Sequence, residues 1–103
     1  MIDQIKKQVT AGDYRFTVHS LERCVERNIS PNEIMYAILA GEVIEDYADD
    51  KYGPSCLIYG IIKGGRVLHV HCSIDPVWII TAYDPTLNPD EWDPEFKRRI
   101  KKS

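Results

Sequence analysis

The spacing of apolar residues changes at Gly41. Before this glycine, apolar side chains recur every three or four residues, which is the period of an amphipathic helix. After it, apolar and polar residues alternate or form continuous runs rich in β-branched and aromatic residues, which indicates strands. A chain whose helices precede a run of strands is typical of an α+β domain, in which the helices pack on a sheet.

Three helices are predicted in the first part, and the third has the clearest boundaries. The segment from Ser30 to Glu33 is a capping box with a proline at the first helical position, and Gly41 closes this helix. The other two helices are expected over residues 1–11 and 18–28. A surface helix turns its apolar stripe toward the core. In the second helix this stripe comprises Val18, Leu21, Cys24 and Val25.

Four strands are predicted in the second part. The apolar runs 55–63 and 66–74 flank Gly64-Gly65, which is a hairpin signal, so these runs should pair antiparallel. Residues 42–47 alternate in polarity, and residues 77–84 follow a plausible turn. We therefore expect a four-stranded antiparallel meander with the N-terminal helices on one face and the other face available for a ligand.

The composition is that of one folded domain over residues 1–103. The chain is 44% hydrophobic and carries a formal net charge of -3. No apolar run reaches the roughly 20 residues of a spanning helix, and no signal peptide is evident, so a cytosolic protein without a membrane partner is predicted. The three cysteines lack a C-x-x-C spacing and are expected to be buried free thiols. After the fourth strand, prolines interrupt the pattern, and a short helix pinned by Trp92 and Phe96 or a partly mobile basic tail over 93–103 is expected.

Three residues at every fourth position form the first candidate site. His19, Arg23 and Arg27 lie along one side of the second predicted helix, beside its apolar stripe. Guanidinium groups bind phosphate through forked hydrogen bonds, and an imidazole transfers protons near neutral pH. The row of His19, Arg23 and Arg27 therefore predicts phosphodiester cleavage or nucleotide binding. The alternative, which stays open, is that both arginines pair with Glu22 or Glu26 in solvent.

The strands supply a second group of candidates. His69 and His71 share one face of their strand, and Thr81 and Tyr83 share one face of the next strand. A structural role is as plausible for each histidine as a catalytic one. Cys72 points to the opposite face from both histidines, and no third ligand is signalled, so no metal and no cofactor are predicted.

Five motifs in order resemble those of the domain-of-unknown-function family four-two-five-eight. The likeness extends over about residues 18–92, and such domains look like members of the RelE, barnase and colicin group of small α+β ribonuclease toxins. The motifs are H-S-L-E-R-C-V-E-R-N-I-S at 19–30, G-E-V-I-E-D-Y at 41–47, Y-G-P-S-C-L at 52–57, R-V-L-H-V at 66–70 and I-T-A-Y-D-P at 80–85.

The resemblance implies a RelE-like or barnase-like fold and a metal-independent endoribonuclease, the toxin of a toxin–antitoxin pair. RNA and an antitoxin protein would be its partners. The acidic net charge departs from the basic character typical of ribosome-dependent toxins. Two other hypotheses stay open: a non-catalytic protein-interaction module, and a metal-binding protein that uses the strand histidines and thiols.

The same resemblance points to the candidates that were found from residue spacing. In such a mechanism a base removes the 2′-hydroxyl proton, an acid protonates the 5′-oxygen, and cations stabilise the phosphorane-like charge. The residues implied are His19 or His69 as the base, Arg23 and Arg27 for the phosphate, and Tyr83 and Thr81 as acid or orienting groups.

Overall fold

The computed structural model describes residues 1–51 and 53–100, which form an α+β domain as predicted. All three predicted helices and all four predicted strands are present, each within two residues of the expected bounds. The helices are α1 (Ile2–Thr10), α2 (Val18–Glu26) and α3 (Pro31–Ala40), and the strands are β1 (Tyr14–Phe16), β2 (Glu42–Tyr47), β3 (Ser55–Ile61), β4 (Val67–Ser73) and β5 (Val77–Tyr83). None of the described helices is long and apolar enough to cross a lipid bilayer.

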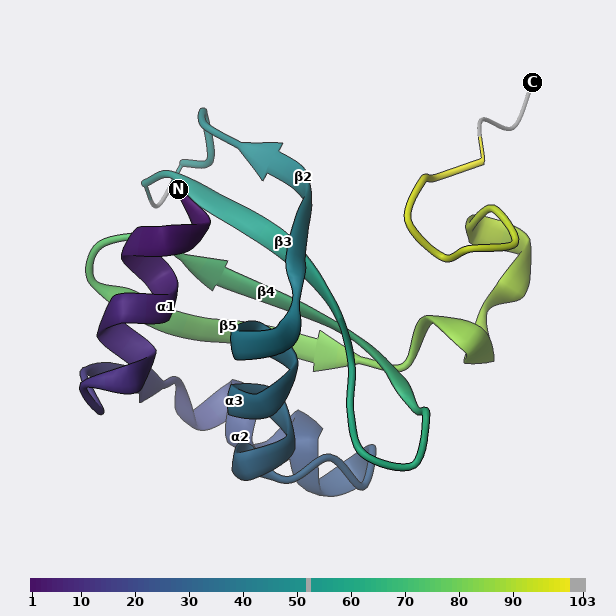
Figure 1. Cartoon of the computed structure of the whole chain (residues 1–103), viewed down its shortest axis with the longest axis horizontal. Helices are drawn as coiled ribbons and strands as arrows, with labels where there is room; N and C mark the ends of the chain where they lie inside the picture. The colour runs from purple at the N-terminus through teal and green to yellow at the C-terminus, as the bar shows by residue number, and fades with distance from the viewer. Residues whose placement is uncertain (52, 101–103) are drawn as a thin grey trace.

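The strands form one mixed sheet in the order β1-β5-β4-β3-β2 (Figure 1). Strands β2 to β5 make the predicted antiparallel meander. Strand β1 was not predicted, and it pairs parallel with β5, Tyr14 lying opposite Val77. Three residues are too few to show an alternating pattern, which is why sequence periodicity missed this strand. The sheet is therefore five-stranded and mixed instead of four-stranded and antiparallel.

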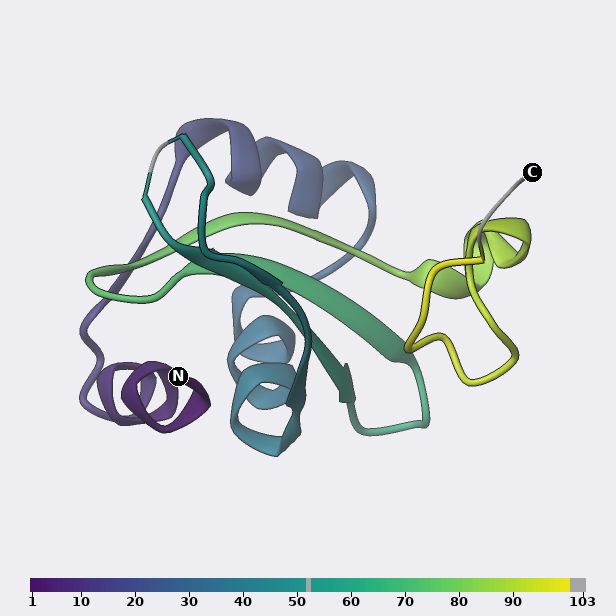
Figure 2. The same cartoon turned by 90° about the horizontal axis from the view of Figure 1, so that it is seen from above.

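The helices lie on both sides of the sheet. Helices α1 and α3 cover one face, whereas α2 lies on the opposite side along β5 (Figure 2). The expectation that all the N-terminal helices share one face is wrong, because β1 carries the chain to the sheet edge between α1 and α2. The core between the sheet and the α1/α3 layer contains Ile34, Ile58 and Val70, all fully buried. Gly60 allows α3 to approach, since a Cβ there would overlap the Ala37 carbonyl group.

The side of helix α2 that packs against the protein is not the side that its apolar stripe predicts. Ser20 and Cys24 are buried, while Val18, Leu21 and Val25 are 75%, 42% and 82% exposed. The buried serine is satisfied locally, because its hydroxyl donates to the carbonyl of Thr17, the N-cap residue. Polar contacts between the end of α2 and β5, described below, oppose rotation of the helix about its axis. Most of the predicted stripe therefore faces solvent.

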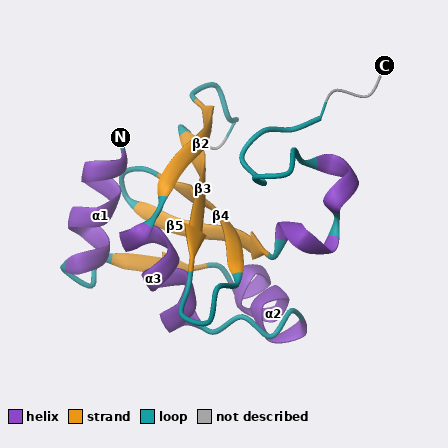
Figure 3. Cartoon of the chain, turned by 45° about the vertical axis from the view of Figure 1, so that its right-hand side comes forward, coloured by secondary structure: helices purple, strands orange, loops and turns teal. Residues whose placement is uncertain are grey.

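Residues 85–100, called the C-terminal segment below, follow β5 and contain no α-helix; the purple ribbons after β5 in Figure 3 are 3-10 turns. The segment forms two 3-10 turns, η1 (Pro85–Leu87) and η2 (Pro89–Glu91), and then a loop closed by a β-bridge between Trp92 and Arg99. The predicted short helix around Trp92 and Phe96 is absent here, because prolines recur too closely for a helix to continue. Of the predicted tail, residues 101–103 lie outside the described residues.

Candidate functional site

A groove of about 610 Å³ lies between the end of α2, the end of β5 and the C-terminal segment. We call it the arginine groove, because three arginines from distant parts of the chain line it, namely Arg27, Arg66 and Arg99. Tyr83, the last residue of β5, lies on the same lining. Acidic side chains offset part of this positive charge. The remaining lining residues are Glu26, Asn28, Asp84, Leu87, Asn88 and Glu91.

Arg27 is held in the groove by β5. Its Nη1 donates to Thr81 Oγ1 at 3.1 Å and to the Ala82 carbonyl oxygen at 2.8 Å. The structure thus brings together two predicted residues, Arg27 and Thr81, with the hydroxyl orienting the guanidinium. A guanidinium has five N–H donors, so these two bonds leave donors for an anion.

Arg66 links the C-terminal end of α2 to Asp84, just after β5. Its Nη1 and Nη2 donate to the carbonyl oxygens of Asn28 and Arg27 at 2.8 and 3.1 Å, which satisfies free carbonyls at the C-terminal end of α2. Its Nε donates to Asp84 Oδ2 at 3.2 Å. Burial raises the pKa of Asp84, but hydrogen bonds from Thr86 and the ion pair with Arg66 outweigh it and hold that pKa below its usual value. Arg66 therefore fixes the position of Arg27, a role that no local sequence pattern indicates.

Tyr83 contacts a buried histidine. His69 is fully buried, with Nε2 at 2.6 Å from the Phe96 carbonyl oxygen and Nδ1 at 3.2 Å from the Tyr83 hydroxyl. A carbonyl oxygen only accepts, so Nε2 carries the proton, and Nδ1 of a neutral ring accepts from Tyr83. Desolvation lowers the pKa of His69, which the Phe96 carbonyl partly opposes, and burial raises the pKa of Tyr83 to about 12. The resting pair is a neutral imidazole and a protonated phenol.

The C-terminal segment is what buries His69. The Trp92 ring packs edge-to-face against the imidazole with a centroid distance of 4.4 Å, and the Arg99 guanidinium lies over the Trp92 ring, 4.6 Å from its centroid. The expectation of a sheet face open to a ligand is therefore wrong at His69, because residues beyond the last strand fold back over it. Two ion pairs fasten the segment to β2, Arg99 with Glu45 and Lys97 with Glu42, each at 3.0 Å.

Four of the six predicted residues are not on the lining of the groove. His69 and Thr81 contact Tyr83 and Arg27, which do line it, whereas no side-chain hydrogen bond among the described residues joins His19 or Arg23 to either of these two. His19 is exposed in the first turn of α2, eight residues before Arg27 and so about 12 Å away along the helix axis. Arg23 pairs with Glu26 at 2.7 Å, the solvent pairing that the sequence left open. Of His19, Arg23 and Arg27, only Arg27 lines the arginine groove.

His71 belongs to a separate cluster on the same sheet face as His69. Its Nε2 is 2.9 Å from Ser55 Oγ, and this hydroxyl donates to Asp50 Oδ2 at 2.8 Å. Burial lowers the pKa of His71, and Asp50 partly offsets this. Ser55 is fully buried, whereas the side chains of His71 and Asp50 are 21% and 23% exposed, and the hydrogen bonds of this cluster tie β4 to β3 and to the loop before β3.

The metal-binding alternative has no geometric support in the part of the chain that is described. No three His, Cys, Asp or Glu side chains among residues 1–51 and 53–100 form a group that could hold a metal ion. Cys24, Cys56 and Cys72 are free and buried, as predicted from their spacing. Cys72 also points to the opposite face from both histidines, since it lies opposite Cys56 on the core side.

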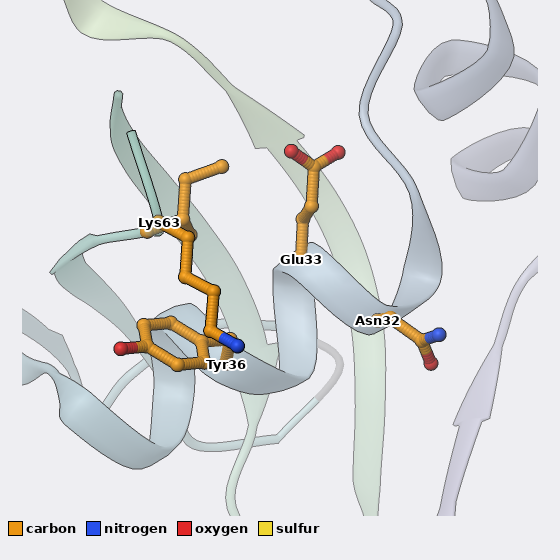
Figure 4. Close-up of a pocket in the computed structure, with 5 residues that line it drawn as sticks. Asn32, Glu33, Tyr36 and Lys63 are labelled. Atoms are coloured by element: carbon orange, nitrogen blue, oxygen red, sulfur yellow. The ribbon is translucent and has the colours of Figure 1, made fainter. Parts of the chain in front are cut away.

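A smaller hollow of about 210 Å³ lies between the first turns of α3 and the end of β3. Figure 4 shows Lys63 running beside the Tyr36 ring, while Asn32 and Glu33 point in different directions. The Lys63 ammonium is 6.0 Å from the Tyr36 ring centroid. These polar groups do not converge on one point, so this hollow is a weaker candidate than the arginine groove.

One family model matches the chain, over residues 16–84, and that family is described as Domain of unknown function (DUF4258). The chain belongs to this family. The matched region runs from the end of β1 through β5, so it includes Arg27, Arg66 and Tyr83 but excludes α1 and the C-terminal segment with Arg99. No curated protein and no solved structure gave a significant match.

Proposed function

We propose that this protein is a metal-independent endoribonuclease, the toxin of a toxin–antitoxin pair related to the RelE and barnase-like group, and that it cleaves RNA in the arginine groove. One observation carries the proposal. Arginines from three distant segments line the same groove as Tyr83, whose hydroxyl is hydrogen-bonded to the buried His69. Fixed cations beside a proton-transfer pair are what phosphodiester cleavage needs.

The proposed phosphate ligands are Arg27 and Arg99. Arg27 keeps free N–H donors after its two bonds to β5, and Arg99 reaches the groove from the C-terminal segment. Arg66 is a positioning residue, because its guanidinium is engaged by Asp84 and by two carbonyl groups. The acidic side chains on the lining, together with the net charge of -3, oppose binding to arbitrary polyanions. We therefore expect RNA binding that is selective and sensitive to salt.

The proposed proton path uses Tyr83 and His69. The ribose 2′-oxygen attacks the adjacent phosphorus, its proton passes to the Tyr83 oxygen, and the Tyr83 proton passes to Nδ1 of His69. The phosphorus–O5′ bond breaks, the 5′-oxygen takes a proton from solvent, and a 2′,3′-cyclic phosphate remains. The lowered pKa of His69 keeps its Nδ1 free to accept at neutral pH, and the raised pKa of Tyr83 keeps the phenol protonated until then.

The test is single-turnover cleavage of labelled RNA, free and ribosome-bound, with EDTA present. Wild type should cleave, and Tyr83→Phe should cleave about 10²-fold more slowly while melting cooperatively, because only the proton-transfer hydroxyl is lost. His19→Gln is the matched control, since this exposed histidine lies off the groove and its loss should leave the rate unchanged.

Three results would count against the proposal. They are a wild-type protein that cleaves neither form of RNA, a Tyr83→Phe variant with the wild-type rate, and cleavage that EDTA abolishes. A rate that falls in His19→Gln instead would return the role of base to that histidine.

A further inference from the structure

The outward side of α2 presents an apolar stripe to solvent. Val18, Leu21 and Val25 are 75%, 42% and 82% exposed on this nine-residue helix. With 3.6 residues per turn, the three side chains fall within about 60° of the helix surface. Single exposed apolar residues are ordinary, but a continuous stripe of them indicates a contact surface.

The described hydrogen bonds that hold α2 lie away from this stripe. Ser20 and Cys24 face the protein, and Thr17 caps the helix by accepting from the Ser20 amide at 2.9 Å. At the other end, Arg27 binds β5 through two hydrogen bonds. Helix α2 is thus held by contacts on its inner side, and Val18 and Val25 of the outer stripe project mostly into solvent.

Among the residues of α2 itself, the carboxylates next to the stripe lie on one of its edges. Glu22 and Glu26 are exposed and follow Val18 at about 40° and 80° around the helix. Glu26 shares its charge with Arg23 at 2.7 Å, whereas the Glu22 carboxylate is an exposed charge directly beside the stripe. The opposite edge leads to the buried Cys24. A partner on this surface therefore meets apolar side chains flanked by carboxylates.

This arrangement disfavours an antiparallel contact with a second copy of the chain. In a two-fold symmetric contact the same patch meets itself, so antiparallel α2 helices would place the acidic edge of one beside that of the other. Like charges at that distance repel. The complementary partner carries positive charge along the matching edge.

We propose that the outward side of α2 binds an amphipathic helix of a partner protein. The apolar residues of that helix cover Val18, Leu21 and Val25, and lysine or arginine on one of its edges pairs with Glu22 and Glu26. This inference stands on α2 alone and does not depend on RNA cleavage. Binding through i, i+3 and i+7 anchors is a general mode of helix recognition.

The experiment uses a display library of designed amphipathic helices in which the apolar face and both edges vary. The full-length protein is the bait, and the double variant Val18→Ser/Val25→Ser is the counter-selection. We expect enriched helices with a basic edge, and binding by fluorescence anisotropy should weaken about tenfold or more in the double variant. Leu39→Ser is the matched control, because Leu39 is also an exposed apolar residue, at 44%, but on α3.

A charge reversal sharpens the result. Glu22→Lys should weaken the helices with a basic edge and strengthen versions of them in which the lysines are replaced by glutamate. Enrichment of no helix, enrichment without a basic edge, or equal binding to wild type and the double variant would overturn the proposal. The proposal would also be overturned if sedimentation showed that the wild type is a dimer and the double variant is a monomer. A second copy of the chain would then cover the stripe. Melting curves must show that the double variant is folded, and Glu22→Lys gives an independent readout if it is not.

Discussion

The two faces of the sheet are stabilised in different ways. On the face toward α1 and α3, side chains such as Ile58 and Val70 are fully buried among other apolar residues. On the opposite face, the C-terminal segment covers His69 through a hydrogen bond from the imidazole to the Phe96 carbonyl and a ring contact with Trp92, and an ion pair ties the segment to β2. Apolar burial has no direction, whereas each polar contact needs one partner at one angle. The first face is therefore robust, and the second depends on particular partners far away in the sequence.

Strand β3 allows the largest test of this difference. Ile58 is fully buried on the α1/α3 side, and Ile61 on the opposite side is 48% exposed. Ile58→Ala should lower the free energy of unfolding by about 4 kcal/mol, because it removes buried methyl groups and leaves a cavity. Ile61→Ala, the matched control, should change it by less than about 0.5 kcal/mol. Equal losses in urea titrations would show that the two faces do not differ as described.

Trp92 tests how firmly the C-terminal segment covers the other face. Its ring is 2% exposed and packs on His69. Trp92→Ala should lower the free energy of unfolding by about 3 kcal/mol, near the lower end of the range for large buried aromatics. It should also expose the imidazole, so the pKa of His69 should rise toward its ordinary value in an NMR titration. A loss below about 1 kcal/mol with an unchanged titration would mean that the cover is only a loose surface contact.

The smallest expected effect is on the pH dependence of stability. Burial lowers the pKa of both His69 and His71 below 6.5 in the folded protein. As pH falls through 6.5, the unfolded chain takes up these protons first, so the stabilisation that is complete above this pH is progressively lost. The free energy of unfolding should therefore decrease below pH 6.5. His69→Gln should flatten the slope, and an unchanged slope in this variant would contradict the prediction.

Much of the fold could be predicted because its signals are local. The Ser30 hydroxyl accepts from the Glu33 amide and the Glu33 carboxylate accepts from the Ser30 amide, both within one turn of α3. Strand β2 has its predicted bounds because its alternation is visible over six residues. The three-residue β1 has no such signal, and the apolar stripe of α2 misled because solvent, not the core, lies against it.

The candidate site could be predicted only in part. Alternation along β4 and β5 puts His69, Thr81 and Tyr83 on one face, and Arg27 joins them because it follows the last turn of α2. His19 and Arg23 share the spacing of Arg27 but do not line the groove. Arg66 and Arg99 do line it, although neither belongs to a spacing pattern that would have marked it.

The sequence by itself determined where the three helices and four of the five strands lie, because helical and strand periods come from backbone geometry within a few residues. Only the tertiary structure decided what covers His69, which side of α2 faces solvent and which arginines share a groove. Arg99 meets Glu45 across 54 positions, and His69 meets Phe96 across 27. Contacts of this kind depend on how the whole chain closes on itself, and no local pattern of residue types encodes them.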